Sequence, residues 1–345
     1  MTVTTGYSAI GNYTTNLTTS GYKGESVIPS SVQPTTEPQA STSTTGHSAN
    51  HSLSLNIDQL FGDTNLQLCP QYNATNKTFP KKMVGLSEEE IIKTHEDLKP
   101  GGAWKPHNCR ARHKIALIIP YRDRKAHLYA FLTFMIPYLK SQLLNFRIIL
   151  VEQEGKELFN KGKLMNAAFL LAEELGIDCV VFHDVDMLPE SDGPYYGCQD
   201  NPVHLGGYVN TLKYVLWYGH LMGGAVVFTT QQFREINGYS NEFWGWGGED
   251  DEMGLRTLAT GYNISRYPNT APYRYRMFRH RKRHWKKYPA ELLNGLLKNV
   301  KARRLWNGLV SNETQWTVVE VSERSLYYHM LVNAGDAPVI WKDLN

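Results

Sequence analysis

Short apolar runs alternate with helical spacing in the middle of the chain. The runs at 114–120, 147–153 and 178–186 have the length and apolar character of buried strands, and the last of them runs into a polar turn. Between them, residues 127–144 and 163–175 place apolar side chains at helical intervals. This alternation predicts right-handed crossovers and an α/β fold with a mostly parallel sheet flanked by helices.

Polar clusters stand at the ends of these predicted strands. They are residues 120–124, the pair Glu152-Gln153 and the triplet Asp184-Val185-Asp186. In open α/β sheets, ligands bind beyond the carboxyl ends of the strands, so these clusters are candidates for a ligand site.

The first fifty residues differ in composition from the rest. They hold twenty Ser and Thr residues, three charged residues and no sustained periodicity. Residues 1–60 are therefore predicted to be a disordered stalk, and the sequence leaves open whether it is O-glycosylated or an ordinary tail. Residues 61–345 are predicted to form a single domain.

Composition and charge exclude several classes of protein. Of the 345 residues, 41% are hydrophobic, which suffices for a sizeable core and excludes a wholly disordered chain. The formal net charge of +3 argues against a dedicated nucleic-acid binder. The longest nearly apolar stretch, 128–139, is too short to cross a bilayer, and the first ten residues lack the features of a signal peptide. We therefore expect no membrane segment in this chain.

Cysteines and sequons bear on the compartment. The four cysteines lack the paired spacing of a zinc site. Seven asparagines head an N-x-S/T triplet, which favours a lumenal or extracellular setting: Asn12, Asn16, Asn50, Asn73, Asn76, Asn263 and Asn312. In such a setting two disulfides can form.

The triplet Asp184-Val185-Asp186 is the first candidate for chemistry. Two carboxylates one residue apart, at the end of a buried strand, can hold Mg²⁺ or Mn²⁺ together with substrate phosphates. The triplet also fits an ordinary polar turn, and by itself it does not decide between the two.

The segment FWGWGGEDDE (243–252) is a sharper signal. Two tryptophans among three glycines give a mobile backbone with flat apolar faces, which suits stacking on a sugar ring. The alternative is a loop of packed aromatics leading into an acidic helix N-terminus, which the helix dipole favours. That alternative explains the acids but not the alternation of glycine and tryptophan, so we favour the functional interpretation.

Met277 and His280 stand three residues apart in the basic run 273–287. Such a pair can face one ligand, and histidine is a common metal ligand. By residue type alone, Met277 is predicted to pack. The basic run is compatible with a solvent-exposed face, with a patch that binds nucleic acid, or with a positive electrostatic field that attracts a diphosphate group.

With these motifs, residues 69–333 resemble the animal β-1,4-galactosyltransferase family, including its β-1,4-N-acetylgalactosaminyltransferase branch. The motifs lie in family order: IALIIPYRDR (115–124), FNKGKLMN (159–166), FHDVD (182–186), GYSNEFWGWGGEDDE (238–252) and RMFRH (276–280). The resemblance implies a GT-A type fold with a Rossmann-like sheet. It also implies one catalytic domain over 61–345, with UDP bound by its N-terminal part and the acceptor and metal by its C-terminal part.

The resemblance implies a role for individual residues. Asp186, Met277 and His280 are the implied Mn²⁺ ligands, which replaces the packing prediction for Met277. Asp250 is the implied catalytic base. The implied donor contacts are Pro120, Arg122, Arg124, Phe159, Lys161, Asp184, Val185, Leu221, Gly224, Trp246 and Glu249. The implied acceptor contacts are Tyr218, Gly248, Asp250 and Asp251, and the implied disulfides are Cys69–Cys109 and Cys179–Cys198.

The implied reaction is a single inverting displacement on a UDP-sugar, UDP-GalNAc or UDP-Gal. Asp250 accepts the proton of the 4-hydroxyl on a glycan ending in N-acetylglucosamine, Mn²⁺ neutralises the departing UDP, and closure of the Trp246 loop excludes water. The expected compartment is the Golgi lumen, or secretion, since the type II anchor usual in the family is not found in this chain.

The donor sugar is predicted from Leu221. It aligns with the position beside the donor's C2 substituent, where members that transfer galactose resemble one another in having tyrosine. Leucine leaves room for an N-acetyl group, so UDP-GalNAc is the predicted donor and UDP-Gal the alternative. An interpretation in which Leu221 is a core residue and Met222 refills the gap stays open.

Some positions depart from the family pattern. Residues 291–303 lack residues that contact the acceptor's N-acetyl group in other members, and Thr211 replaces a lysine, with Lys213 close by. These departures affect the identity of the acceptor more than the class of reaction.

Two other functions are disfavoured. An inactive lectin-like protein is disfavoured by the intact acidic and metal motifs. A nucleic-acid binder using 274–287 is disfavoured because stacking aromatics are not clearly interleaved with the basic residues.

Overall fold

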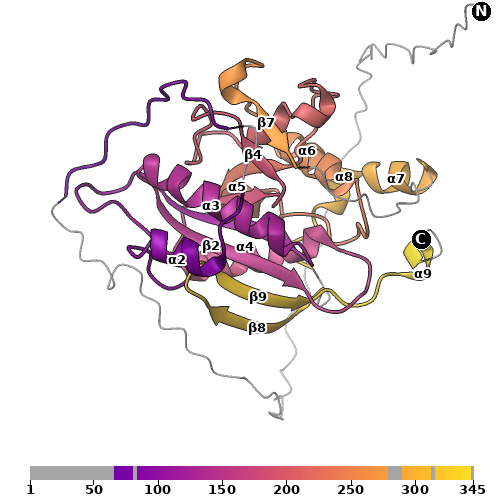
Figure 1. Cartoon of the computed structure of the whole chain (residues 1–345). Helices are drawn as coiled ribbons and strands as arrows, with labels where there is room; N and C mark the ends of the chain where they lie inside the picture. Colours follow the sequence, from indigo (N-terminus) through magenta and orange to yellow (C-terminus); the bar gives the residue numbers. More distant parts are fainter. Residues whose placement is uncertain (1–65, 81–83, 279–289, 312–314, 343–345) are drawn as a thin grey trace, which may run out of the picture. The chain divides into compact units, whose positions relative to one another are not determined.

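A seven-stranded sheet lies at the centre of the computed structural model, which describes residues 66–80, 84–278, 290–311 and 315–342 (Figure 1). The strand order is β5-β6-β3-β1-β2-β9-β8. In chain order the strands are β1 (Lys114–Tyr121), β2 (Asn145–Gln153), β3 (Cys179–His183), β5 (Val203–His204), β6 (Ala225–Thr229), β8 (Thr317–Glu323) and β9 (Tyr328–Asn333). The short strands β4 (Met187–Pro189) and β7 (Tyr275–Met277) form a second sheet. The predicted stalk and His280 lie outside the described residues.

The centre of the sheet is parallel and its edges are antiparallel. Strand β1 pairs in parallel with β2 and β3, and β2 pairs in parallel with β9. Strands β6, β5 and β8 pair antiparallel with their neighbours. The predicted α/β class with a mostly parallel sheet is therefore confirmed.

Helices connect the strands as the periodicity predicts. The α-helices are α2 (Glu88–Thr94), α3 (Lys125–Ser141), α4 (Lys161–Glu174), α5 (Thr230–Glu235), α6 (Glu249–Ala259), α7 (Ala290–Leu297), α8 (Val300–Arg303) and α9 (Val339–Lys342). Short 3₁₀ turns lie at η1 (Leu205–Gly207), η2 (Asn210–Leu212) and η3 (Ala271–Tyr273). Helices α3 and α4 carry the two predicted helical patterns.

Helices α3 and α4 cover opposite faces of the sheet. Successive strand residues point to opposite faces, so alternate β1 side chains enter different cores. Ile115, Leu117 and Ile119 pack in the core that contains α3. Ala116 and Ile118 pack in the core that contains α4. Both cores are closed to water, which is why β1 is a continuous apolar run in the sequence.

The carboxyl ends of the three predicted strands meet at one edge of the sheet. Tyr121 of β1 pairs with Glu152 of β2, and Ile118 pairs with Phe182, one residue before the end of β3. The polar clusters that follow these strands are thereby brought to the same edge, as predicted.

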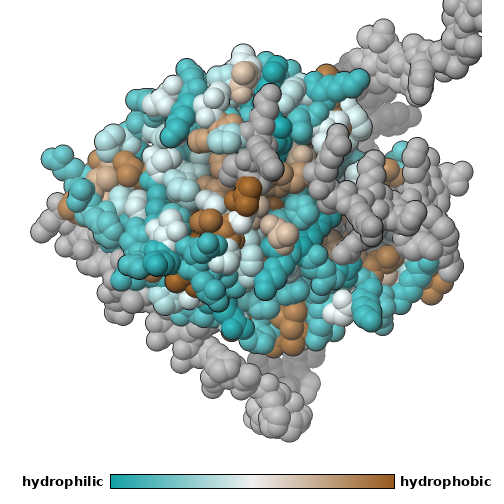
Figure 2. Space-filling model, viewed as in Figure 1, coloured by the Kyte–Doolittle hydropathy of each residue, from teal (hydrophilic) through white to brown (hydrophobic). Residues whose placement is uncertain are grey.

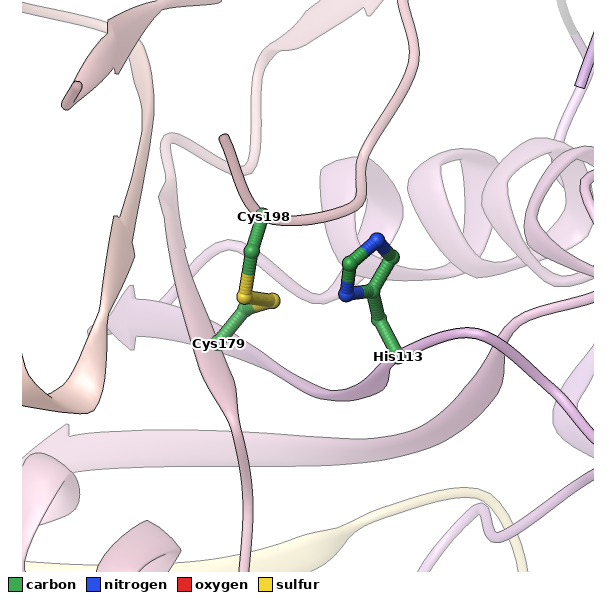
Figure 3. Close-up of side chains that lie close together, drawn as sticks. All are labelled: His113, Cys179 and Cys198. Carbon is green, nitrogen blue, oxygen red and sulfur yellow. A yellow bond between two sulfur atoms is a disulfide. The ribbon is translucent and has the colours of Figure 1, made fainter. Parts of the chain in front are cut away.

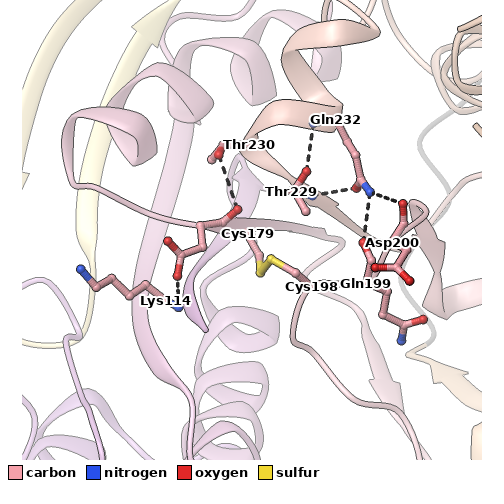
Figure 4. The surroundings of a disulfide bond; sticks show 9 residues. Lys114, Cys179, Cys198, Gln199, Asp200, Thr229, Thr230 and Gln232 are labelled. Atoms are coloured by element: carbon pink, nitrogen blue, oxygen red, sulfur yellow. Dashed lines mark hydrogen bonds between the residues drawn. A yellow bond between two sulfur atoms is a disulfide. The ribbon is translucent and has the colours of Figure 1, made fainter. Parts of the chain in front are cut away.

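Two disulfides cross-link the chain, and one of them involves β3 of this sheet. Cys69 is bonded to Cys109 and Cys179 to Cys198, so both implied pairings are confirmed. Beyond Cys198, the side chain of Gln232 donates to the carbonyls of Gln199 and Asp200, at 3.0 Å each (Figure 4). The segment after the Asp184–Asp186 turn is thus anchored to both β3 and α5.

His113 lies beside the second disulfide, with its ring turned toward the sulfurs (Figure 3). The ligand atoms of His113, Cys179 and Cys198 lie within 4.8 Å of one another. Because both sulfurs are engaged in a disulfide, they are not thiolate donors, and we do not interpret this cluster as a metal site.

The face drawn in Figure 2 is mostly hydrophilic, with small separate hydrophobic groups. Large apolar side chains exposed in the described ranges include Trp217, Trp246 and Trp306. Among the helices that the structure describes, none has both the length and the apolar character that a bilayer crossing requires.

Candidate active site

The acidic run forms the first turn of α6. Glu249, Asp250, Asp251 and Glu252 follow the N-cap Gly248, whose φ is +92°. A Cβ on Gly248 would lie 2.6 Å from the ring of Phe243, so both the backbone angle and the space require glycine. The packing alternative also predicts acids at a helix N-terminus, so their position alone does not distinguish it from a functional site. The contacts of these acids distinguish the two.

Lys161 brings three of the predicted site carboxylates together. Its Nζ lies 3.0 Å from Asp184, 3.2 Å from Asp250 and 3.6 Å from Glu249. Lys161 is the first residue of α4, whose N-cap Asn160 accepts from the backbone N–H of Lys163. The start of α4, the turn after β3 and the start of α6 thus converge on one ammonium group.

The electrostatics of this cluster are set by burial and by the lysine. Burial raises the pKa of Asp250 well above its usual value, Lys161 opposes that rise, and Glu249 and Asp184 add to it. For Lys161, burial alone would lower the pKa, but the surrounding carboxylates outweigh it and raise the pKa. A half-buried carboxylate whose pKa is raised is a stronger base than an ordinary carboxylate.

Asp186 and Met277 lie on neighbouring segments. Met277 is the register partner of Met187 in the β4–β7 ladder, and the N–H of Phe278 donates to the carbonyl of Asp186 at 2.7 Å. The carboxylate of Asp186 is buried and accepts from Arg124 at 2.7 Å. The sulfur of Met277 accepts from the Thr211 hydroxyl at 3.8 Å.

The donor set at this position fits a divalent cation. A carboxylate suits Mn²⁺, whereas a thioether is an unusual addition to it. Met277 also packs partly against the core, and the next residue, Phe278, bonds to Asp186. Its role as a metal ligand stays a prediction. The third implied ligand, His280, lies outside the described residues.

Residues implied to contact the nucleotide lie at or just after the ends of β1, β2 and β3. The guanidinium of Arg122 is 5.1 Å from the ring centroid of Phe159 and donates to the carbonyl of Glu157 at 2.7 Å. Pro120 is buried at the end of β1, and Val185 is buried in the turn after β3. These residues all lie near the carboxyl edge of the sheet.

The two tryptophans of the glycine-rich segment have different environments. Trp244 is 2% exposed, and the ammonium of Lys163 lies 4.6 Å from its ring centroid, as expected for a packed aromatic. Trp246 is 66% exposed, although the N–H of its neighbour Gly245 donates to the carbonyl of Phe159. The packing alternative therefore describes Trp244 and not Trp246.

Residues implied to contact sugars occupy the segment 218–224. The Tyr218 hydroxyl donates to the Asp251 carboxylate, and burial and this bond raise the pKa of Tyr218. Met222 is fully buried, whereas Leu221 is half-buried. The core position is therefore that of Met222, which weighs against Leu221 as a core leucine. The segment ends where Gly224 accepts from the N–H of Asp184 at 2.8 Å.

Sequence reasoning missed three residues that belong to or contact this segment. A Cβ on Gly223 would lie 2.7 Å from Oδ2 of Asp250, so the Asp250 carboxylate rests against a glycine. The Gly223-Gly224 pair is a local signal for such a close approach. Arg266 and His204 bind the backbone of the same segment, and no local pattern distinguishes them.

Comparison with known proteins gives consistent matches. A family model described as the N-terminal region of glycosyl transferase group 7 matches residues 69–199, and one described as the N-terminal domain of galactosyltransferase matches residues 203–281. Human β-1,4-galactosyltransferase 6 is 43% identical over 190 residues, or 53% of this chain and 50% of that protein. Danio rerio β-1,4-galactosyltransferase 5 is 39% identical over 274 residues, or 77% of this chain and 70% of that protein. The match thus spans half the length of the human relative and more of the Danio rerio one.

A solved structure has the same architecture. The catalytic domain of Drosophila β1,4-galactosyltransferase 7 in complex with xylobiose gives a TM-score of 0.55 at 28% identity, covering 64% of this chain and 93% of that one. A mutant of that protein, in complex with manganese, UDP-Gal and xylobiose, gives the same TM-score and identity. The implied GT-A type architecture is confirmed by this likeness.

Proposed function

Because the chain belongs to the β-1,4-galactosyltransferase family, we propose that it transfers galactose from UDP-Gal to the 4-hydroxyl of a terminal N-acetylglucosamine. The observation that carries this proposal is the convergence of Asp250, Glu249 and Asp184 on Lys161 at the carboxyl edge of the sheet. Ligands bind at this edge in α/β folds, and the cluster holds a half-buried carboxylate whose raised pKa suits a general base.

In this proposal Asp250 is the catalytic base. Its carboxylate lies between the backbone of Gly223 and the ammonium of Lys161, so its orientation is restricted from two sides. The base accepts the proton of the acceptor hydroxyl while that oxygen attacks the anomeric carbon and UDP departs, which inverts the configuration. Lys161 offsets the charge of the acids until a substrate diphosphate takes over that contact.

We propose Asp186, Met277 and His280 as the residues that hold Mn²⁺. When bound, the ion would supply a positive charge that stabilises the diphosphate leaving group. Arg124, whose guanidinium holds the Asp186 carboxylate, orients that ligand. The exposed Trp246, flanked by glycines with positive φ, is proposed to close over the donor and exclude water.

The donor predicted from Leu221 was UDP-GalNAc, and the comparisons favour the alternative. The human, Danio rerio and Drosophila relatives are all named galactosyltransferases, and the Drosophila mutant was crystallised with UDP-Gal. UDP-GalNAc remains the second candidate on one observation: Leu221 is half-buried beside a core already filled by Met222, so it is available to contact a sugar.

The Golgi lumen is the proposed compartment. This proposal rests on the family and on the two disulfides, which form in oxidising compartments.

A matrix of donors and acceptors tests the function. UDP-Gal, UDP-GalNAc and UDP-Glc would each be mixed with simple β-glycosides of N-acetylglucosamine, glucose and xylose, with Mn²⁺ or with EDTA, and product and UDP measured. We expect galactose transfer to N-acetylglucosamine that EDTA abolishes and that Asp186→Asn nearly abolishes. Sugar binding without UDP release from any pair would instead identify an inactive lectin-like protein.

The same matrix separates the two donors. If UDP-Gal is preferred by the wild type, the main proposal stands, and Leu221→Tyr should reduce whatever UDP-GalNAc use remains. A wild type that prefers UDP-GalNAc, and that Leu221→Tyr converts to UDP-Gal, would establish the second candidate. The expected size is modest, because burying one acetyl methyl is worth about 1 kcal/mol.

A further inference from the structure

The segment 218–224 rests directly on α6. A Cβ on Gly254 would lie 1.7 Å from the carbonyl oxygen of His220, so backbone meets backbone there. Tyr218 donates to Asp251 one turn earlier on the same helix. This side of the segment is therefore held by the helix that carries the proposed base.

Arg266 holds the opposite side of the segment. Its Nη2 donates to the carbonyl of Gly219 at 2.9 Å and to that of Leu221 at 2.7 Å. Its Nε donates to Nδ1 of His204 at 3.0 Å. One planar guanidinium thus binds three acceptors, which a flexible ammonium cannot reproduce.

His204 extends this contact to Gly223. A guanidinium has only donors, so Nδ1 of His204 must accept, and Nε2 carries the hydrogen that it donates to the carbonyl of Gly223 at 2.9 Å. His204 is 1% exposed; burial, with Arg266 adding to it, lowers its pKa to about 3. The imidazole is therefore neutral at physiological pH, and both of its bonds persist.

Both residues stand on a rigid support. His204 belongs to β5, which pairs with β6 of the central sheet. The N–H of Ser265 donates to the carbonyl of Pro202, and the N–H of His204 donates to that of Ser265, at 2.9 Å each. Because Ser265 directly precedes Arg266, these two bonds also fix the backbone of Arg266 at the edge of the sheet.

We propose that Arg266 and His204 are positioning residues that set the donor-sugar preference by clamping the carbonyls of Gly219, Leu221 and Gly223. The clamp fixes the backbone on both sides of Leu221, and so fixes where that side chain stands. It also holds Gly223, against which the Asp250 carboxylate rests. The effect on donor preference rests on the proposed function, whereas the clamp itself can be tested without catalysis.

The kinetic test compares Arg266→Met with a matched control, Arg304→Met. Arg304 is also half-buried and donates to a backbone carbonyl, that of Glu235, which does not belong to the segment 218–224. The readout is the ratio of kcat/KM for UDP-Gal to that for UDP-GalNAc, which does not depend on how much enzyme is folded. We expect Arg266→Met to change this ratio about threefold or more and to lower kcat/KM about tenfold or more, while Arg304→Met leaves the ratio unchanged.

Two variants of His204 test its part. Glutamine keeps both an acceptor and an N–H donor, so His204→Gln should retain most of the wild-type ratio. His204→Phe removes both and should change the ratio in the same direction as Arg266→Met. Should Arg266→Met fail to fold, Arg266→Lys keeps the charge but not the three bonds, and it should shift the ratio less.

Hydrogen exchange of the amides of 219–224 tests the clamp in the absence of substrate. Exchange there should be faster in Arg266→Met than in the wild type, and unchanged in Arg304→Met. Faster exchange with an unchanged donor ratio would overturn the role in specificity, and unchanged exchange would overturn the clamp. A wild type that turns over none of the sugars would refute the proposed function while the exchange result still decides on the clamp.

Discussion

Asp250 is the residue on which the proposed chemistry depends. Replacing it with asparagine removes the proton acceptor but keeps the shape of the side chain, so Asp250→Asn should lower kcat about 10²–10⁴-fold. UDP affinity, measured by calorimetry with Mn²⁺, should fall much less than kcat, because Arg122 and Phe159 do not contact Asp250 and Lys161 keeps Asp184 and Glu249 as partners.

Asp251→Asn provides the comparison from the same helical turn. Asp251 contacts Tyr218 and is not part of the Lys161 cluster, so its loss should raise the acceptor KM more than it lowers kcat. A loss of UDP affinity in Asp250→Asn as large as its loss of kcat would reassign Asp250 to donor binding.

Lys161 should control the pH dependence of the reaction. The pKa of Asp250 is raised by burial, lowered by Lys161 and raised by Glu249 and Asp184. Lys161→Met removes the group among these that favours the ionised form, so the pKa of Asp250 should rise further. Because the base acts when ionised, the acid limb of the kcat/KM profile should move to higher pH.

Lys161→Arg is the control for that shift. It keeps the positive charge beside the carboxylates, so its acid limb should stay close to that of the wild type. An unshifted profile in Lys161→Met would mean that another group sets the acid limb.

At the scale of elements, the capping box of α5 should stabilise the anchored edge of the site. The Thr229 side chain accepts from the N–H of Gln232, and the Gln232 side chain accepts from the N–H of Thr229, at 2.9 Å each. Thr229→Ala should lower the free energy of unfolding by about 1 kcal/mol, since it removes the N-cap side chain. Urea denaturation measures the change.

Thr230→Ala is the matched control for the capping box. Its hydroxyl makes a long 3.5 Å contact to the carbonyl of Asp178, so its loss should cost clearly less. Equal losses in the two variants would show that the cap contributes little.

The elements also show which strands and helices can be predicted from the period of apolar side chains. The strands and helices from β1 to β3 were predicted because their apolar side chains recur at regular intervals in both cores. Two-residue β5 and three-residue β4 and β7 carry no period, and they exist because long-range partners complete their backbone hydrogen bonds.

At the scale of the whole molecule, the two disulfides should act differently. Cys69–Cys109 spans 40 residues, and Cys179–Cys198 spans 19 residues that include the Asp184–Asp186 turn. In the chain-entropy model each stabilises the fold by about 3–4 kcal/mol, with the longer loop gaining slightly more. Paired Cys→Ser variants should therefore both lower stability in urea.

Activity should separate the two paired variants. The Cys179→Ser/Cys198→Ser variant should lose more activity per folded molecule, because its disulfide closes the loop that carries Asp184 and Asp186. Peptide mapping of the wild type should find both bonds, and activity losses that simply follow stability in both variants would contradict a specific effect on the site.

The sequence alone determined the fold class, the sheet edge where the polar clusters gather and the residue types of the candidate site there. These follow from local properties: the period of apolar side chains, the polar residues after each strand and the family motifs in order. Only the tertiary structure decided which charges meet, because Lys161 and Asp250 are 89 positions apart and Arg266 and His204 are 62 positions apart. Such pairs leave no local pattern: they are brought together by the packing of helices on the sheet, and that packing also buried Trp244 and left Trp246 exposed.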